Sequence, residues 1–195
     1  MMKYKIALVS LLFFGGFFAN AQYKYEREHR IKKSQFPPAA LQLIENNISD
    51  VKRFKYYKET DSIKTSFEAK LKKDKLWYSM GFDENGILND IKIVIKPVDI
   101  PSETLQRINA YLENSFTKYK VKRLMQQYPY DANEELEATL RNAFQNLLLP
   151  SINYKYMVKG KKEKGYLDYE ILFDAEGNFK NHRKMPPPNF DHVLY

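Results

Sequence analysis

The stretch MGFDENGILN, residues 80–89, returns in related form as ILFDAEGNFKN, residues 171–181. Both contain Phe-Asp-x-x-Gly. Aspartate suits the first position of a type I turn, and glycine suits the later position that needs a positive φ in a G1-bulge hairpin. A calcium-binding EF-hand loop needs its glycine further from the first aspartate and a glutamate at the twelfth position, so that alternative is excluded. The sequence predicts two equivalent hairpin turns, and we expect no metal and no other cofactor.

The residues around both turns alternate between apolar and polar. Such a period of two is typical of antiparallel strands that bury one face. A pair of strands precedes each Phe-Asp-x-x-Gly turn. The loop that joins the two strands of the pair is KKDK, residues 72–75, in the first case and KGKKEKG, residues 159–165, in the second. A further strand begins at Val51 and, in the same way, at Val121. The alternating apolar positions are Phe67, Ala69, Leu71, Leu76, Tyr78, Met80 and Phe82, then Tyr154, Tyr156, Val158, Leu167, Tyr169, Ile171 and Phe173.

A short amphipathic helix is predicted ahead of each set of strands. FPPAALQLIENNI, residues 36–48, and IPSETLQRINAYL, residues 100–112, share an apolar residue followed by proline and then Leu-Gln-x-Ile. Apolar residues at i, i+3 and i+7 form one helical stripe, and proline is tolerated in the first turn. The chain is therefore interpreted as two tandem copies, residues 34–97 and 98–183. The matched stripe residues are Leu41 with Leu105, Ile44 with Ile108 and Ile48 with Leu112.

The second copy contains additional sequence. YDANEELEATLRNAFQNLLLP, residues 130–150, lies between two of its predicted strands. Asp131 and Glu134 have the spacing of a capping box, and Pro150 ends the apolar pattern. We predict an inserted helix over residues 131–149, which either covers part of the apolar face of the sheet or binds a partner. Its apolar stripe is Leu136, Leu140, Ala143, Phe144 and Leu147.

The N-terminal residues have the pattern of a secretory signal peptide. Lys3 and Lys5 precede an apolar run over residues 6–18, and ANAQ supplies the small residues needed for cleavage after Ala21. The run is shorter than the roughly 20 residues that span a bilayer. We therefore expect residues 1–21 to be removed, no membrane span in the remaining chain, and a periplasmic or secreted protein.

Two segments flank the tandem copies. Residues 22–33 form a basic lead-in, either a linker or a short edge element, and residues 184–195 form a tail whose proline triplet favours an extended conformation. The chain has no cysteine, so the exported fold depends on its core and not on disulfides. The net charge is +8, but lysines and acids are interleaved along the chain. Together with export, this interleaving argues against a nucleic-acid partner.

No motif points to catalysis. The three histidines, His29, His182 and His192, lack the i, i+3 or i, i+4 spacing of a metal-binding helix. No G-x-S-x-G nucleophile elbow and no glycine-rich phosphate loop is present. We therefore predict that the protein is not an enzyme.

Two features are candidate partner contacts. Trp77, the one tryptophan, aligns with Asp168 on the strand face where the second copy is polar, which makes it the best single candidate for an exposed contact residue. The alternative is that the inserted helix or another helix covers it. Lys161, Lys162 and Lys164 in the KGKKEKG stretch could hold an anionic partner, or could form an ordinary solvated turn.

The order of these features resembles the PepSY-like proteins, also described as β-lactamase-inhibitor-like, which are common in the envelopes of Bacteroidota. The resemblance covers about residues 34–183 and depends on the duplicated helix, the Tyr- and Lys-rich strands and the FDENG and FDAEG turns. It implies an α+β fold in which a helix packs on an antiparallel sheet in each repeat, and two such repeats can join into one curved sheet. The chain departs from β-lactamase inhibitor protein itself in two ways: it lacks the disulfides of that inhibitor, and it carries the inserted helix.

The resemblance implies a non-catalytic exported protein that binds another envelope or secreted protein through a sheet face, in an inhibitor-like or regulatory role. The alternative is an envelope carbohydrate- or peptidoglycan-binding module that uses Trp77 and strand tyrosines. An enzyme of unrecognised type is the third reading. The sequence leaves the partner's identity and the oligomeric state open.

Overall fold

The computed structural model describes residues 27–49, 51–60, 64–133, 135–163 and 165–185. The expected signal peptide, Glu134, Lys164, His192 and tail residues 186–195 lie outside this part of the chain. The strands are β1 Arg27–Ile31, β2 Lys52–Thr60, β3 Thr65–Lys73, β4 Leu76–Phe82, β5 Leu88–Val94, β6 Lys118–Pro129, β7 Asn153–Lys162, β8 Gly165–Asp174 and β9 Phe179–Met185. The α-helices are α2 Pro38–Asn47, α3 Ser102–Ser115 and α4 Leu136–Phe144, and the 3-10 turns are η1 Lys33–Gln35 and η2 Pro97–Asp99.

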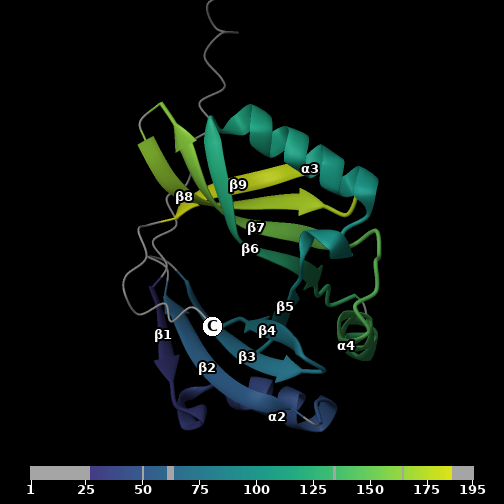
Figure 1. Ribbon diagram of the computed structural model, residues 1–195. Helices are drawn as coiled ribbons and strands as arrows, with labels where there is room; N and C mark the ends of the chain where they lie inside the picture. The colour runs from purple at the N-terminus through teal and green to yellow at the C-terminus, as the bar shows by residue number, and fades with distance from the viewer. Residues whose placement is uncertain (1–26, 50, 61–63, 134, 164, 186–195) are drawn as a thin grey trace, which may run out of the picture.

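The nine strands form an antiparallel sheet in which strand order follows chain order from β1 to β9. Figure 1 shows β1 to β4 with α2 in the lower part of the molecule and β6 to β9 with α3 in the upper part, so that the strands lie between these two helices. The predicted α+β class is confirmed. None of the helices in the described ranges is long and apolar enough to cross a membrane.

The two Phe-Asp-x-x-Gly stretches form equivalent hairpin turns, as predicted. The Gly86 N–H donates to the Asp83 carbonyl at 3.1 Å, and the Gly177 N–H donates to the Asp174 carbonyl at 3.1 Å. Both glycines have a positive φ, 84° and 87°. The Asp174 carboxylate accepts a bond from the Asn178 N–H at 2.7 Å. Burial opposes ionisation of Asp174, but hydrogen bonds from Asn178 and from the turn backbone outweigh it and lower its pKa.

Helices α2 and α3 lie where the sequence predicted them. Each has proline at its N-cap, and the carbonyls of Pro37 and Pro101 accept the first helical bonds, from the Leu41 N–H at 3.0 Å and the Leu105 N–H at 2.9 Å. Proline fits because the N–H that it lacks would have no partner within the helix. The stripe residues Ile44, Ile108 and Leu112 are buried, whereas Leu41, Ile48 and Leu105 are partly buried against the core.

All three α-helices pack on one face of the sheet, which we call the helix face. Ring contacts join the helix side to alternate strand residues: Phe36, just before α2, lies 5.7 Å from Phe82, and Tyr111 of α3 lies 5.3 Å from Phe173. Leu76 is only partly buried and Leu167 is 38% exposed. The buried strand residues of this face include Ala69, Leu71, Tyr78, Met80, Phe82, Tyr154, Tyr156, Val158, Tyr169, Ile171 and Phe173, in agreement with the predicted alternation.

Helix α4 is the predicted insertion between two strands of the second half, but it is shorter than residues 131–149. It begins after Glu135 with no side-chain cap, so the predicted cap at Asp131 is wrong, and the Asp131 carboxylate instead accepts a bond from the Asn133 N–H. It ends at Phe144 because Asn146 adopts a left-handed conformation with φ of 52°, a common helix stop. Leu147 therefore lies beyond the helix and is 38% exposed.

The position of α4 favours the first of its two predicted roles. Leu140 and Ala143 are buried in the core, and the Phe144 ring lies 5.2 Å from Tyr78 of β4. The helix therefore covers the middle of the helix face, near β5 and β6.

Within the lead-in, residues 22–33, Arg27–Ile31 pair with β2 at the edge of the sheet, which agrees with the short edge element, one of the two predicted alternatives. Another predicted segment differs from the structure. The predicted loop 159–165 is mostly strand, because β7 continues to Lys162 and β8 begins at Gly165. Gly160 fits this strand because the Phe116 ring occupies the space of a side chain: a Cβ there would lie 2.4 Å from the ring. At the C-terminal side, Lys184 and Met185 belong to β9.

Candidate binding face of the sheet

The face of the sheet opposite the helices carries mainly charged and amide side chains, and we call it the polar face. None of the three α-helices lies on it. Cross-strand pairs such as Glu68 with Tyr57 and Lys92 with Gln127 place its members on the same side. Its central members are Glu28, Glu68, Lys70, Trp77, Ser79, Asp90, Lys92, Gln127, Asn153, Lys155, Glu170 and Arg183.

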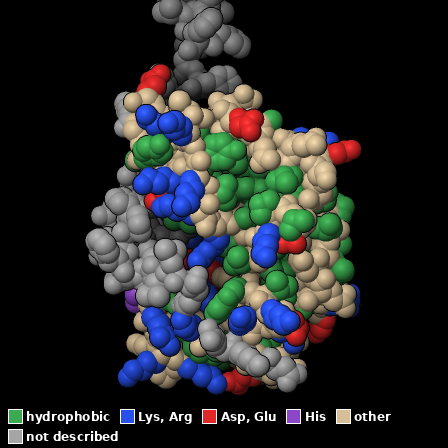
Figure 2. Space-filling model, in the orientation of Figure 1, with side chains coloured by type: hydrophobic (Ala, Val, Ile, Leu, Met, Phe, Trp, Pro, Cys, Tyr) green, Lys and Arg blue, Asp and Glu red, His purple; other side chains and the backbone are tan. Residues whose placement is uncertain are grey.

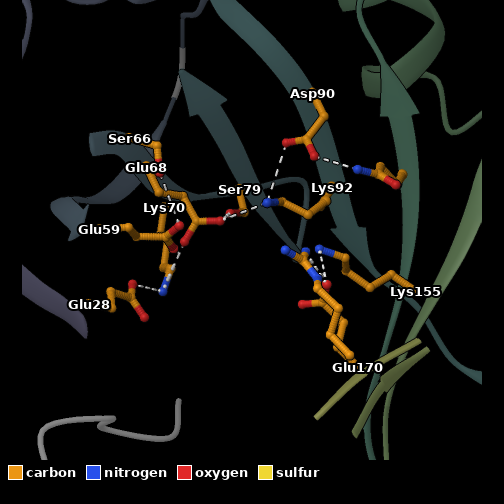
Figure 3. Close-up of polar contacts among 12 residues, drawn as sticks. Glu28, Glu59, Ser66, Glu68, Lys70, Ser79, Asp90, Lys92, Lys155 and Glu170 are labelled. Atoms are coloured by element: carbon orange, nitrogen blue, oxygen red, sulfur yellow. Dashed lines mark hydrogen bonds and ion pairs between the residues drawn. The ribbon is translucent and has the colours of Figure 1, made fainter. Parts of the chain in front are cut away.

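A network of ion pairs crosses the first five strands of this face (Figure 3). The Lys70 ammonium bonds to the Glu28 carboxylate and lies 3.1 Å from Glu68. The Lys92 ammonium lies 3.1 Å from Glu68 and 3.3 Å from Asp90. Each ammonium group thus lies between two carboxylates that come from two different strands. Such pairing lets buried charges remain ionised.

Amide side chains carry the same network to the last strand. The Gln127 side-chain amide donates to Asp90, and the Asn153 amide donates to Gln127 at 3.4 Å. The Lys180 ammonium then donates to Asn153 at 3.0 Å. Together with the ion pairs, these bonds make a connected polar path from β1 to β9.

A second group of charges lies beside this path. The Glu170 carboxylate, in β8, is 3.2 Å from the Lys155 ammonium and 2.6 Å from the Arg183 guanidinium. Its side chain is buried, whereas Arg183 is partly exposed. Figure 3 shows Lys155 and Glu170 across from Asp90 and Lys92.

The buried charges of this face are held ionised by their neighbours. Burial would raise the pKa of Glu68, but Lys92 and Lys70 outweigh burial and hold that pKa well below its usual range. Burial would likewise lower the pKa of Lys92, yet Asp90 and Glu68 raise it well above its ordinary value. The centre of the polar face is therefore a fixed pattern of opposite charges at neutral pH.

Three carboxylates of the network are close enough to hold a metal ion together. Ligand oxygens of Glu28, Glu59 and Glu68 lie within 4.8 Å of one another. The Lys70 ammonium already bonds to Glu28 and lies 3.1 Å from Glu68, and Lys92 lies on the other side of Glu68. The positive charge that this cluster needs is thus supplied by lysines, and the geometry supports an ion-pair cluster.

Trp77 lies on the polar face of β4, as the alignment of the two turns predicted, and it is partly buried. The Lys72 ammonium lies 5.6 Å from its ring centroid. Trp77 also lines a small pocket of about 90 Å³, together with Lys70, Tyr78, Val94 and Arg123. The tryptophan is therefore outside the helix-covered core and beside a hollow of the polar face.

The predicted lysine group is divided between the two faces of the sheet. Lys161 is on the polar face, with its ammonium 6.0 Å from the Tyr166 ring centroid. Lys162 points to the helix face, where its ammonium lies 5.3 Å from the Phe116 ring. The alternation of a strand causes this division, which a loop would not impose. Lys164 lies outside the described residues.

Sequence reasoning missed the polar network and three further lysines, Lys118, Lys120 and Lys159. Part of their signal was present in the alternation itself, because Glu68 and Lys70 flank Ala69, and Lys120 lies between Tyr119 and Val121. The strand register, which the sequence does not give, decides which of them meet.

The molecule thus belongs to the class of α+β proteins with helices on one face of an antiparallel meander. No protein-family model and no curated protein matches the sequence. Solved structures do resemble it. A BLIP-like protein from Bacteroides fragilis is 13% identical, over 80% of this chain and 93% of its own, with a TM-score of 0.50.

A second structure, from Bacteroides eggerthii and described as a candidate periplasmic protein, is 11% identical, over 76% of this chain and 88% of its own, with a TM-score of 0.50. A DUF2874 family protein from Bacteroides ovatus is 9% identical, over 76% of this chain and 88% of its own, with a TM-score of 0.46. At these identities the likeness concerns the fold. The fold is thus similar to that of the BLIP-like protein, while the PepSY assignment stays a prediction.

Proposed function

We propose that the protein is exported to the periplasm and there binds another envelope protein through its polar face, in an inhibitor-like or regulatory role without catalysis. The signal-peptide pattern of residues 1–21 and the periplasmic description of the Bacteroides eggerthii neighbour support export. The BLIP-like neighbour supports an inhibitor-like role. The absence of a catalytic motif in the sequence is consistent with binding alone.

One observation carries this proposal: all three α-helices cover the same face of the sheet, so that within the described part of the chain no helix lies on the opposite face. That face is held in one arrangement by its ion pairs, and a rigid surface loses little conformational freedom when a partner binds. It also carries Trp77 and Arg123 at a pocket, two residue types that are enriched at the energetic centres of interfaces. Figure 2 shows Lys and Arg side chains over both the upper and the lower half of the molecule.

We also infer that residues 34–97 and 98–183 are two copies of one unit, with α4 inserted in the second. The two prolines at the helix starts, the two glycines at the turns and the two sets of alternating strand residues occupy corresponding places. A duplicated unit would give one sheet with two similar halves, which suits the recognition of an extended partner surface.

The alternative function, binding of an envelope carbohydrate, has support in Trp77 and in Tyr166, which is 51% exposed, but these two residues line different pockets. A sugar platform needs several exposed aromatic rings in one groove, but the other aromatic residue at the Trp77 pocket, Tyr78, is 3% exposed. The pocket itself is small. Protein binding is therefore the better-supported function.

Capture from an envelope extract tests the proposal. The immobilised protein should retain a defined envelope protein, which then binds the purified protein in solution. Trp77→Ala should weaken that binding, because it removes a large apolar contact, by about tenfold or more if Trp77 is a hot spot. Ile87→Ala is the matched control, since Ile87 is 55% exposed but lies in the turn before β5. Retention of glycans without any protein would contradict the proposal and favour the alternative.

A further inference from the structure

Strand β6 has an unpaired edge along half of its length. Its residues from Lys118 to Gln127 pair with β7, but only Met125–Pro129 pair with β5. The last bond toward β5 is donated by the Ile95 N–H to the Leu124 carbonyl, at 3.1 Å. Within the described ranges, residues 118–123 therefore have a strand on one side only. Such an edge presents N–H and C=O groups that another extended chain can pair with.

The polar face beside this edge is unusually basic. Lys118 lies directly opposite Lys161, and Lys120 lies directly opposite Lys159. All four side chains are exposed, and within the described part of the chain none of them forms an ion pair. Like charges directly opposite each other in a sheet are destabilising. The neighbouring Lys122 differs, because it pairs with Asp168 at 2.8 Å.

A groove follows the same edge. It has a volume of about 370 Å³ and is lined by Lys118, Tyr119, Lys120, Lys159 and Tyr166. The ammonium groups of Lys159 and Lys161 lie 5.5 Å and 6.0 Å from the Tyr166 ring centroid, so the ring contacts both lysines on the polar face. At the other end of the edge, Arg123 lines the Trp77 pocket. Trp77 and the four lysines are thus linked by one strand edge.

We propose that the edge of β6 from Lys118 to Arg123 binds an extended acidic segment of the partner protein, which adds to the sheet as a further strand. This inference rests on the proposed function and specifies the partner's chemistry. In an extended chain, alternate residues are roughly 6.6 Å apart and point the same way. Acidic residues at every second position of the segment would therefore meet Lys118 and Lys120, whose own spacing along β6 is the same.

Charge complementarity favours this occupant over a second copy of the chain. A second β6 edge would place Lys118 and Lys120 against lysines, and such repulsion is how edge strands avoid pairing with their own kind. An acidic strand relieves the repulsion within the Lys118–Lys161 and Lys120–Lys159 pairs and fills the open hydrogen bonds at the same time. The lysines therefore select the partner as well as protecting the edge.

Binding of a labelled peptide of alternating Glu and Thr to the purified protein tests this inference, with hydrogen exchange as a second readout. The peptide should bind, more weakly as salt rises, and should protect backbone amides within residues 118–123. A peptide of the same composition with its glutamates in adjacent pairs should bind more weakly, because half of its acids point away from the lysines. Failure of the alternating peptide to bind, or binding without protection of these amides, would overturn strand addition.

Matched variants distinguish binding at the β6 edge from a general effect of the protein's positive charge. Lys118→Gln with Lys120→Gln should weaken the peptide complex about threefold or more, at the usual strength of exposed ion pairs. Lys64→Gln with Lys75→Gln removes the same charge from exposed positions before β3 and in the β3–β4 turn and should leave the affinity unchanged. Equal loss in both variants overturns the proposal, as does tighter binding of an oligogalacturonate, which would indicate a glycan. If the captured envelope protein binds the edge variant as well as wild type, the edge inference fails while the proposed function stands.

Discussion

Gly177, in the turn between β8 and β9, lies directly against Thr104 in the first turn of α3: a Cβ on Gly177 would fall 2.6 Å from the Thr104 carbonyl oxygen. The Thr104 hydroxyl in turn donates to the Ala175 carbonyl at 3.3 Å. The first half repeats this contact, since a Cβ on Gly86 would fall 2.9 Å from the Ala40 nitrogen. Each hairpin turn is thus fastened to the start of a helix.

Substitution of this glycine should be costly for two separable reasons. Gly177→Ala places a side chain at a positive φ, which costs about 1–2 kcal/mol, and also pushes against α3, which typically costs about 1–3 kcal/mol more. Gly165→Ala is the matched control, because Gly165 has a φ of 104° but nothing within 4 Å of its Cβ position. Chemical denaturation should show a larger loss of unfolding free energy for Gly177→Ala. Equal losses would mean that the turn does not press on the helix.

Gly160 gives a second packing test. Because the Phe116 ring lies 2.4 Å from its Cβ position, Gly160→Ala should lower the free energy of unfolding by about 1–3 kcal/mol. Phe116→Leu in the same chain should recover part of this loss by making room. A double-mutant cycle in denaturant measures the coupling. Strictly additive effects would show that the ring moves aside without cost.

Removal of a buried charge should lower the free energy of unfolding far more than removal of an exposed one. Glu68→Gln leaves Lys70 and Lys92 without a shared carboxylate and should destabilise the protein by about 3–5 kcal/mol. Glu45→Gln removes an exposed ion pair, in which the Glu45 carboxylate lies 2.6 Å from the Lys33 ammonium, and should hardly change stability because solvent screens both groups. Denaturation at neutral pH compares the two. Similar small effects would mean that the network is not held together as described.

The lowered pKa of the same carboxylate predicts that the free energy of unfolding depends on pH in the acidic range. The pKa of Glu68 is lowered in the folded state, so its stabilisation is present above the unfolded pKa of about 4.3 and is lost as pH falls below that value. The wild-type free energy of unfolding should therefore decline in acid. In Glu68→Gln this decline should be shallower, because one of the carboxylates responsible is gone. An unchanged acid slope would argue against the lowered pKa.

His182 predicts a second effect at milder pH. Burial, with Lys162 and Lys184 nearby, lowers the pKa of its imidazole. The unfolded chain then binds the proton more readily, so stability should fall as pH decreases through about 6.5, the unfolded value. His182→Gln should remove this fall between about pH 7 and pH 5, whereas His29→Gln, at an exposed position of β1, should retain it. Thermal melts across this range provide the measurement.

The sequence predicted the elements whose signals are local. The hairpin at Asp83–Gly86 follows from turn chemistry, and the burial of Tyr78 and Met80 follows from strict alternation. The composition of Lys159–Lys162 is that of a solvated turn and predicts a loop, whereas these residues form the end of β7. Their strand form depends on Phe116 filling the space at Gly160 and on pairing with β6, and both are tertiary contacts that no local pattern reveals.

The candidate site was predictable only in part. The alternation placed Trp77 on the polar face, because a strand assigns faces by parity. The partners of Glu68 were not predictable, since Lys92 is on another strand and the register decides which charges meet. The open edge of β6 was hidden for a related reason: it arises because β5 is shorter than β6, and sequence patterns define strand ends poorly.

The order of the strands has a consequence for how the molecule forms. Every strand of the described sheet pairs with the strands next to it in the chain. A chain that emerges N-terminus first can therefore complete each pair as soon as its second strand appears, and loop closure between neighbours is inexpensive. Only the newest strand then waits unpaired at the growing edge, so that the interval in which the nascent sheet is open to aggregation is brief at every stage.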